Sequence, residues 1–422
     1  MRRAVGLFFQ FCVIVLLLVL GGMTQQRYNW INKIPYISGT QNRSAQSKSA
    51  TKYTTNAPSR VNLGEFWEVW AQVEKDYLET DKVVDQNMVD GAISGMVSSL
   101  GDPYTMYLPP KENERSGEDL AGSFFGVGIE LGYIDQTLAV VAPLPGSPAD
   151  KAGIKAGDLI LKVKDEAKKL DEDTSGWSLN QAVDNIRGPK GTQVTLTLFR
   201  PNDKAKTETF EVNLIRDEVV VKSVELNIEK VGNKRIADLK LIRFGGRTDS
   251  EWNNAVNQII QEKDNLDGIV LDLRNNPGGY FDGAIEVASE FVPSGVIVTE
   301  KGKTTSQNFS ANGRARLQGL PLVVLVNKGS ASASEIVAGA LRDRLKTKLV
   351  GEKTFGKGTV QDRRELSNGG GLHVTIARWL LPSGEWIHHE GLNVDIEAKD
   401  DPNTKPDEAL IKAVEVLPAR SN

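Results

Sequence analysis

Short segments of almost uninterrupted apolar residues alternate with helix-like segments between residues 218 and 400. This alternation constrains the fold more than any other feature. "DGIVLDLR" and "LPLVVLVN" are apolar at most positions, whereas "FDGAIEVASEFV" and "SEIVAGALRDRL" have the length of helices. Strands without polar alternation are buried on both faces, as in a parallel sheet covered by helices. We therefore expect an α/β core over residues 218–400, followed by a C-terminal helix and tail over 401–422.

The chain is long enough for several domains, and its overall charge excludes one class of partner. Its 422 residues correspond to two to four domains of on the order of 100–200 residues each. The net charge is −4 with 25% charged residues, so we expect no nucleic-acid partner. No pattern of metal ligands or cofactor-binding residues stands out, and we expect neither a metal nor a cofactor.

The first residues form an apolar segment, residues 4–23, in which Gln10 is the polar exception and no residue is charged. About 20 apolar residues are needed to cross a bilayer, more than the ~7–15 of a cleavable signal core. We expect residues 1–24 to be a signal-anchor transmembrane helix, with the rest of the chain extracytoplasmic. Arg2 and Arg3 before the segment are balanced by Arg27 and Lys33 after it, which weakens the orientation signal.

The single cysteine, Cys12, lies inside this apolar segment, so the exported part has no disulfide or thiol chemistry. Residues 25–60 are rich in Ser, Thr, Asn and Gln and contain no acid, which is typical of a flexible linker. Ser49-Ala50-Thr51-Lys52 matches the Ser-x-x-Lys signature of penicillin-binding enzymes. In a flexible linker we interpret that match as chance.

Residues 61–117 are predicted to be a helical N-terminal domain. "EFWEVWAQVEKDYL" carries one apolar stripe, and "DGAISGMVSSL" is a second helix that breaks at Gly101-Asp102-Pro103. The stripe is a packing face or, alternatively, a dimerisation face. Its members are Phe66, Val69, Trp70, Val73 and Tyr77.

Residues 118–217 change to short strands and Gly-rich turns, and their order of elements resembles a PDZ domain. PDZ domains bind the C-terminus of a peptide as an added strand, with the carboxylate held by backbone amides of a Gly-rich loop. The alternative for these glycines is an ordinary tight turn. By position the resemblance implies a peptide-binding loop and strand start at Phe125, Gly126, Val127, Gly128 and Ile129.

The stretch "KGSASASEIVAGALRD" places three serines directly before a helix-like pattern. Ser332-x-x-Glu335 fits a capping box, in which the two side chains satisfy backbone N–H groups of the first helical turn. The alternative is that one of the hydroxyls is a nucleophile, which requires a base. The chain's histidines, His373, His388 and His389, show no such spacing, and a packing or surface role is favoured for them.

A lysine can replace histidine as the base only if its amine is neutral, so its pKa of ~10.4 must fall close to neutral pH through burial. "GEKTFGKGTVQ" places Lys357 between two glycines, with the neutral amide of Gln361 four residues later. Taken alone, Lys357 fits a solvated loop as well. Gly351-x4-Gly356-Lys357 also resembles a Walker A loop, but Gly358 replaces the required Ser or Thr and no helix-like pattern follows.

Acyl transfer also requires backbone N–H groups that stabilise a negative oxygen. "DLRNNPGGY" ends a buried strand at Gly278 and Gly279, where a substrate carbonyl can approach the main chain. The helix after Ser332 offers a free N–H at Ala333. A plain strand-end turn is the alternative for Gly278.

These motifs together resemble the carboxyl-terminal processing (tail-specific) serine peptidases, over about residues 61–416. The resemblance rests on "SASASE", "TFGKGTVQ", "DLRNNPGG", "GAISGMVSSLGDPYT" and the PDZ-like module. It implies a ClpP/crotonase-type α/β core with a β-rich strip. It also implies cleavage near disordered, apolar C-termini, a PDZ domain that captures or gates the tail, and dimers formed through helical ends. Carried over by position, the site residues are Ser332 as nucleophile, Lys357 as base, Gln361 as its support, and Gly278 and Ala333 as the oxyanion hole.

Two departures from the family pattern concern specificity. Phe125 stands where a small residue is common, and Trp379, Leu380 and Leu381 replace a Tyr- or Thr-containing strand end. The competing hypothesis is a noncatalytic PDZ-type receptor or adaptor that binds exposed tails. Neither departure touches the serine or the lysine.

Overall fold

The computed structural model describes residues 61–201, 209–399 and 407–420. The predicted anchor and linker lie outside this range, and none of the helices inside it is long and apolar enough to cross a membrane. The chain divides into two compact units. The smaller unit is residues 118–222, and the larger unit combines the chain up to Gly117 with the chain from Ser223.

The larger unit is built on a six-stranded sheet in which β10 and β11 are antiparallel and all further neighbours are parallel. This is the largely parallel sheet that the apolar segments predict. In sheet order, the strands are β10 (Val224–Val231), β11 (Lys234–Leu241), β12 (Gly268–Asp272), β15 (Leu322–Val326), β16 (Lys348–Gly351) and β19 (Ile396–Glu397).

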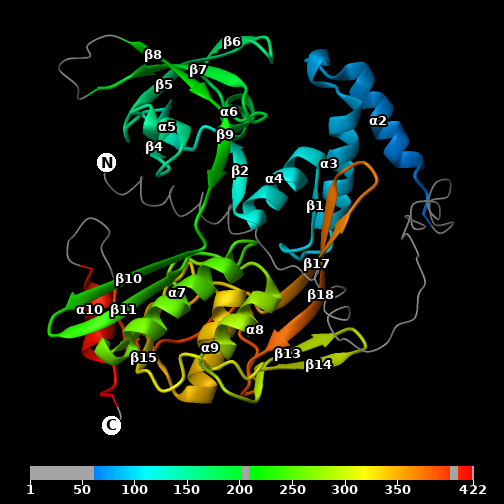
Figure 1. Ribbon diagram of the computed structural model, residues 1–422. Helices are drawn as coiled ribbons and strands as arrows, with labels where there is room; N and C mark the ends of the chain where they lie inside the picture. Colours follow the sequence, from blue (N-terminus) through cyan, green and yellow to red (C-terminus); the bar gives the residue numbers. More distant parts are fainter. Residues whose placement is uncertain (1–60, 202–208, 400–406, 421–422) are drawn as a thin grey trace, which may run out of the picture. The chain divides into compact units, whose positions relative to one another are not determined.

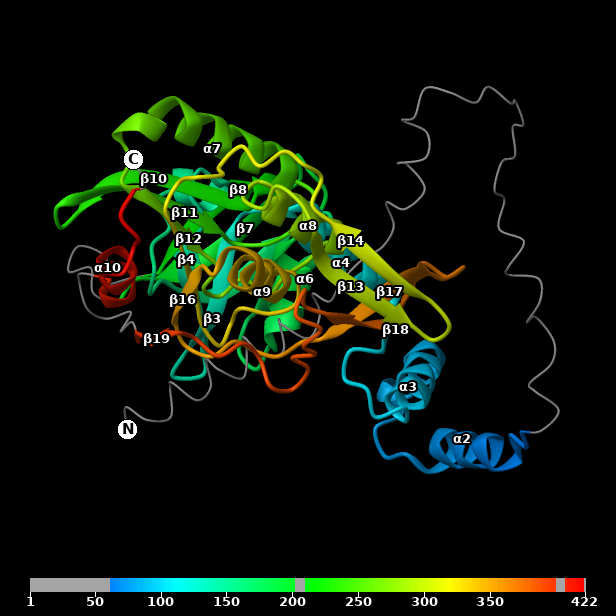
Figure 2. The same ribbon diagram turned by 90° about the horizontal axis from the view of Figure 1, so that it is seen from below.

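Helices cover both faces of this sheet, which is why every residue of β12 and β15 is buried. Successive residues belong to different cores: Leu271 packs in the core that includes α7, α8 and α9, and Val270 packs with α10. Figures 1 and 2 show α10 apart from the other three helices. The helices are α7 (Thr248–Glu262), α8 (Phe281–Ser289), α9 (Ala333–Leu345) and α10 (Glu408–Glu415).

A second sheet of the larger unit carries the end of the lysine motif, and Figure 2 shows β13 and β14 beside β17 and β18. Its first strand, β1, comes from the N-terminal segment and pairs antiparallel with β18, Met106 opposite His373. The strands are β1 (Met106–Leu108), β18 (Gly371–Leu380), β13 (Val296–Gly302), β14 (Ser306–Ser310) and β17 (Thr359–Glu365).

The N-terminal segment is helical as expected, apart from β1. The expected break at Gly101-Asp102-Pro103 lies between α3 and β1. The apolar stripe of α2 is not buried in the chain, because no residue of α2 is buried and its members Phe66 and Val69 are 37% and 60% exposed. The helices are α2 (Gly64–Asp76), the 3-10 turn η4 (Thr80–Lys82), α3 (Asp85–Ser98) and α4 (Pro110–Ala121).

The smaller unit contains a six-stranded antiparallel sheet in the order β3-β4-β5-β7-β8, with β6 on β5, and a two-stranded pair of β2 and β9. Its helices are α5 (Pro148–Lys151) and α6 (Leu179–Ile186). The strands are β2 (Ser123–Gly126), β3 (Ile129–Ile134), β4 (Thr137–Pro143), β5 (Leu159–Asp165), β6 (Leu170–Asp173), β7 (Gln193–Phe199), β8 (Phe210–Ile215) and β9 (Asp217–Val220).

A buried ion pair joins β5 to the end of β8. Arg216 and Asp165 are 1% and 0% exposed, and the Arg216 guanidinium also donates to the Ile186 carbonyl (2.8 Å) and the Thr192 hydroxyl (2.9 Å). Burial by itself raises the pKa of Asp165, but hydrogen bonds from Arg216 and the Lys168 N–H outweigh it and hold that pKa below its usual value. The pair thus stabilises the unit at neutral pH, and this contribution is lost as the pH falls through the lowered pKa.

Removal of the arginine leaves the Asp165 charge buried without its partner. We expect Arg216→Leu to lower the free energy of unfolding of the smaller unit by about 3–5 kcal/mol. The measurement is native-state hydrogen exchange of β5 and β7 amides in the full chain. Lys162→Leu is the control, because the Lys162–Asp171 pair between β5 and β6 is exposed. Loss of an exposed pair should leave the protection of these amides unchanged. Equal protection in both variants would contradict this assignment.

Candidate active site

Ser332 begins α9 with a backbone conformation that a helix cap does not require. An ordinary N-cap residue is extended, whereas Ser332 has φ 57° and ψ −117°. Such a conformation is strained for a residue with a side chain, and strain of this kind concentrates at functional sites. The Glu335 half of the expected capping box does form, because the Glu335 carboxylate accepts from the Ser332 N–H at 2.8 Å. Ser332 thus starts the helix and is also held in an unusual geometry.

The Glu335 carboxylate connects this serine turn to the lysine loop. It is fully buried and accepts three further hydrogen bonds, from the Thr354 hydroxyl (2.5 Å), the Gly356 N–H (2.7 Å) and the Lys357 N–H (2.9 Å). Burial raises the pKa of Glu335, and the four hydrogen bonds act against that shift because they favour the charged form. One side chain therefore fixes both segments that carry the candidate dyad.

Lys357 is not a solvated loop residue, since it is 2% exposed. Burial lowers its pKa to about 8, and the negative charges of Asp102 and Glu335 act in the opposite direction. Its amine lies 4.8 Å from the centre of the Tyr104 ring, which faces the cation. Burial, with the charges of Glu335 and Asp102, also raises the pKa of Tyr104 to about 12. The lysine is thus close to the neutral state that a general base requires.

Gln361, in β17, is 1% exposed. Its amide nitrogen donates to the hydroxyls of Thr359 (2.9 Å) and Thr375 (3.0 Å). Its carbonyl oxygen is buried and has no hydrogen-bond partner among the described residues. A buried acceptor without a donor is costly, and a lysine amine is a donor that could satisfy it.

The glycine turn after β12 lies against the serine turn. Gly278 has φ 96°, and a Cβ there would lie 2.8 Å from the Ser332 Cβ and 3.0 Å from the Ala333 nitrogen, so this position requires glycine. The Ala333 N–H belongs to the first turn of α9, where no intrahelical acceptor exists. The Gly278 N–H donates instead to the Asn276 side chain at 2.9 Å. As an oxyanion donor it must turn away from Asn276 or share its hydrogen.

Several residues of this site were missed by the sequence analysis. Tyr104 and Asp102 come from "GDPYT", which local pattern alone marks only as a helix break. Asp102 accepts from the Tyr104 N–H (3.0 Å) and the Thr105 hydroxyl (2.7 Å), so the turn holds the ring in place. The family resemblance of this stretch was the one signal that could have pointed to it.

The histidines take the packing or surface roles that the sequence favours, with His389 exposed. His388 accepts from the Gly358 N–H at 3.2 Å and stacks on Trp386. His373 is 2% exposed, and its burial lowers its pKa to about 4. A neutral histidine next to the lysine loop adds no further charge there.

In the smaller unit, the predicted peptide-binding loop ends at Gly128, where close packing leaves no room for a side chain. Gly128 has φ 73°, and a Cβ there would lie 2.3 Å from the Ser147 Cβ. The loop leads into β3, which begins at Ile129 and is the terminal strand of its sheet in the described residues. Phe125 and Gly126, which were predicted to belong to this loop, lie at the end of β2 instead, and Phe125 is 45% exposed. A free strand edge next to a Gly-rich loop is the arrangement that strand addition requires.

Comparisons with known proteins identify the family of the chain. The model of peptidase family S41 matches residues 235–398, a PDZ-domain model matches 117–199, and the model of the activating protease CtpB N-terminal domain matches 17–112. The carboxy-terminal processing protease CtpA of Bacillus subtilis is 37% identical over 331 residues, which is 78% of this chain and 67% of that protein. A CtpA-like serine protease of Staphylococcus epidermidis is 37% identical over 351 residues, 82% of this chain and 68% of that protein.

The chain belongs to peptidase family S41. It is a serine-type peptidase of the carboxy-terminal processing class. A solved structure described as an S41 protease from Bacteroides fragilis matches with a TM-score of 0.53 and 16% identity, covering 82% of this chain and 95% of that one. That likeness concerns the fold alone. The expected S41 architecture, a crotonase-like α/β peptidase core with an inserted PDZ domain, is confirmed.

The four hydrogen bonds to Glu335 generate a test of its positioning role. Glu335→Gln keeps the shape of the side chain but replaces one carboxylate oxygen with an NH2 group. That group is itself a donor, so it cannot accept hydrogen bonds from the backbone N–H groups. We expect kcat/KM to fall about 100-fold through misplacement of the serine and lysine segments, with a loss of roughly 1–3 kcal/mol in stability. The measurement is peptide hydrolysis alongside thermal unfolding. Glu352→Gln, a partly exposed acid on the same loop, is the control and should cut at the parent rate. Full activity of Glu335→Gln would refute the role.

Proposed function

We propose that this S41 peptidase hydrolyses peptide bonds near the C-terminus of protein substrates, with Ser332 as nucleophile and Lys357 as general base. The observation that carries the proposal is the buried amine of Lys357, whose pKa is about 8, on a loop fixed to the serine turn by one carboxylate. A neutral amine can take the proton of a serine hydroxyl, which is otherwise a poor nucleophile.

The chemistry then follows in two steps. In acylation, Lys357 accepts the Ser332 proton while the serine oxygen attacks the scissile carbonyl carbon. The Lys357 ammonium then protonates the leaving amine as the C–N bond breaks. In deacylation, Lys357 takes a proton from water as the water oxygen attacks the ester carbonyl carbon. The bond to the serine oxygen then breaks, the Lys357 ammonium returns the proton to that oxygen, and the new carboxylic acid leaves and ionises. The oxyanion is held by the Ala333 N–H and by the Gly278 N–H once it leaves Asn276, and Gln361 orients the amine.

We assign capture of the substrate tail to the PDZ domain. Its support is the short loop of Val127 and Gly128 between β2 and β3, followed by the free edge of β3, which offers backbone groups to an added strand. A relative of this chain is described as a carboxy-terminal processing protease, which fits substrates with exposed tails. The noncatalytic receptor hypothesis is disfavoured, because a tail receptor has no use for a buried lysine and a strained serine whose backbone N–H groups are held by the same carboxylate.

Membrane attachment is part of the same proposal. Residues 1–24 would anchor the protein, residues 25–60 would act as a linker, and the catalytic part would lie on the extracytoplasmic side. The support is the uncharged apolar segment of residues 4–23. Detection of the full chain in the membrane fraction, and of residues 25–422 in the soluble fraction, is the measurement that tests it.

We also propose a homodimer or higher homo-oligomer through the N-terminal helices. The exposed apolar stripe of α2, which includes Phe66 and Val69, would be covered by a second copy together with the neighbouring exposed Trp67. Sedimentation of the parent and of Trp67→Glu tests this. A monomeric parent would contradict it.

The dyad predicts a specific dependence of activity on pH. Because only the neutral form of Lys357 is a base, kcat/KM should rise with pH through an apparent pKa of about 8 and level off above it. Ser332→Ala and Lys357→Ala should lose activity by several orders of magnitude, on the order of 10³-fold or more. Lys353→Ala, an exposed lysine on the same loop, is the matched control and should retain both the rate and the pH profile.

A kcat/KM of Ser332→Ala equal to that of the parent would contradict the assignment of Ser332 as the nucleophile. A pH profile that is flat between 6 and about 9, the interval that spans the lowered lysine pKa, would sink the assignment of the base.

A further inference from the structure

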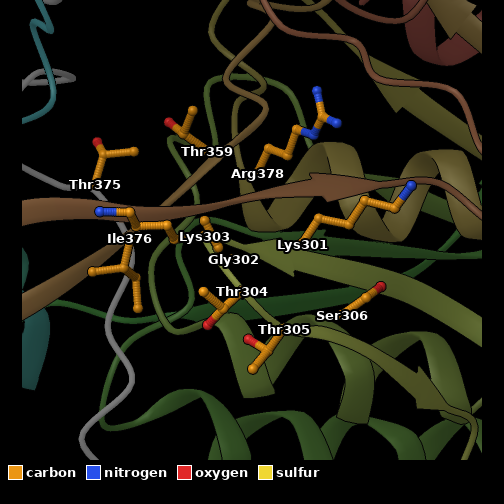
Figure 3. A pocket seen from close by; sticks show the side chains of 11 residues that line it. Lys301, Gly302, Lys303, Thr304, Thr305, Ser306, Thr359, Thr375, Ile376 and Arg378 are labelled. Carbon is orange, nitrogen blue, oxygen red and sulfur yellow. The ribbon is translucent and has the colours of Figure 1, made fainter.

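A pocket with a volume of about 660 Å³ lies where β13 and its turn meet β17 and β18. Figure 3 shows side chains from these three strands around it. Three of its lining residues are cationic, Lys301, Lys303 and Arg378, and no lining residue is acidic. Threonine hydroxyls and backbone complete most of the wall. A space of this size accommodates a side chain or a chain end of a polypeptide.

Two of the cations belong to directly opposite residues of neighbouring strands. Lys301 in β13 is opposite Arg378 in β18 in antiparallel register, and Arg378 is opposite Thr359 in β17. Directly opposite residues of an antiparallel pair point to the same face, and like charges there are destabilising. Within the described ranges of the chain, neither cation nor Lys303 has a carboxylate within ion-pair distance of 4.0 Å.

The six-stranded sheet of the larger unit contains a similar pair of cations with a compensating carboxylate. Lys230 in β10 is opposite Arg235 in β11, the same arrangement of charges. There Arg235 has its own carboxylate, Glu262, at 2.9 Å. The Lys301–Arg378 pair has no carboxylate partner among the described residues. The Arg378 guanidinium lies 5.3 Å from the centre of the Trp386 ring, a contact that does not neutralise its charge. An external anion would therefore relieve the repulsion.

The pocket is joined to the catalytic residues through its threonines. Gln361, which we assign to support Lys357, donates to both Thr359 and Thr375, and both threonines line the pocket. Thr359 is two residues from Lys357 in the chain. The anion would thus bind close to the peptide bond that is cut.

We propose that this pocket is a substrate subsite for a carboxylate of the polypeptide, from either an acidic side chain near the cut or the free C-terminus. The inference rests on the proposed function and adds a specificity to it. A guanidinium, ammonium groups and hydroxyls are the donors that a carboxylate accepts from. Protein substrates supply carboxylates of both kinds, so the experiment separates the two sources.

The test measures kcat/KM for pairs of peptides that differ in one carboxylate. One series moves a single Glu through the positions that flank the cut, each with a Gln twin. A second series compares a free C-terminus with a C-terminal amide. We expect the parent to favour the charged twin by about five- to tenfold in one series. The series that shows the preference identifies the source.

The decisive readout is the ratio of rates within each pair, compared among enzyme variants. In Lys301→Gln and in Arg378→Gln the ratio should fall towards one, and in Lys301→Glu it should invert. The ratio should be unchanged in Lys230→Gln, the matched control. Because the PDZ domain also recognises a C-terminal carboxylate, any preference due to that domain would persist in the Lys301 variants, and such persistence would overturn the subsite.

A second measurement separates failure of the subsite from failure of the proposed function. Binding of the same peptide pairs to Ser332→Ala, followed by fluorescence anisotropy, needs no cleavage. A charge preference that depends on Lys301 supports the subsite even if the parent cuts no peptide, a result that would count against the proposed function alone. Equal binding of both twins to Ser332→Ala and to its Lys301→Gln double variant would refute the subsite.

Discussion

The candidate active site depends on one buried carboxylate that accepts hydrogen bonds from two distant segments of the chain. Glu335 holds the N–H of Ser332 on its own helix and the N–H groups of Gly356 and Lys357 on the loop before β17. Without it, the helix start and the loop would be positioned only by the strands they follow. The carboxylate also adds negative charge near the lysine, so the low pKa of Lys357 reflects burial that outweighs this charge.

Strain and close packing make the same site intolerant of other residues. Ser332 adopts a positive φ although it is not glycine, and Gly278 approaches it so closely that a side chain is excluded. Such a contact exists because β12 and β15 are neighbours in a parallel sheet and both chains turn at the same edge. Functional sites of open α/β sheets form at these carboxyl ends for that reason.

The sequence predicted the parts of the molecule that depend on local pattern. β12, β15 and α9 follow from apolar runs and helical spacing. Local pattern made Lys357 a candidate base that fits a solvated loop as well, and the family resemblance singled it out. Three contacts could not be predicted in this way. β1 is three residues long and carries no detectable period. Tyr104 contacts Lys357 although the two residues are far apart in the sequence. The capping pattern predicts one of the four hydrogen-bond donors to Glu335, the Ser332 N–H. Long-range pairing alone creates these contacts.

The chain enters and leaves the smaller unit through two paired strands, β2 and β9. β2 and β9 run antiparallel, and the Val221 N–H donates to the Gly122 carbonyl at 3.0 Å. The two ends of the inserted module are therefore adjacent, which is the condition under which one folded module can be exchanged for another without stretching the host. A foreign recognition domain with neighbouring termini could be grafted between these two strands, which makes the chain a scaffold for proteases with redirected targets.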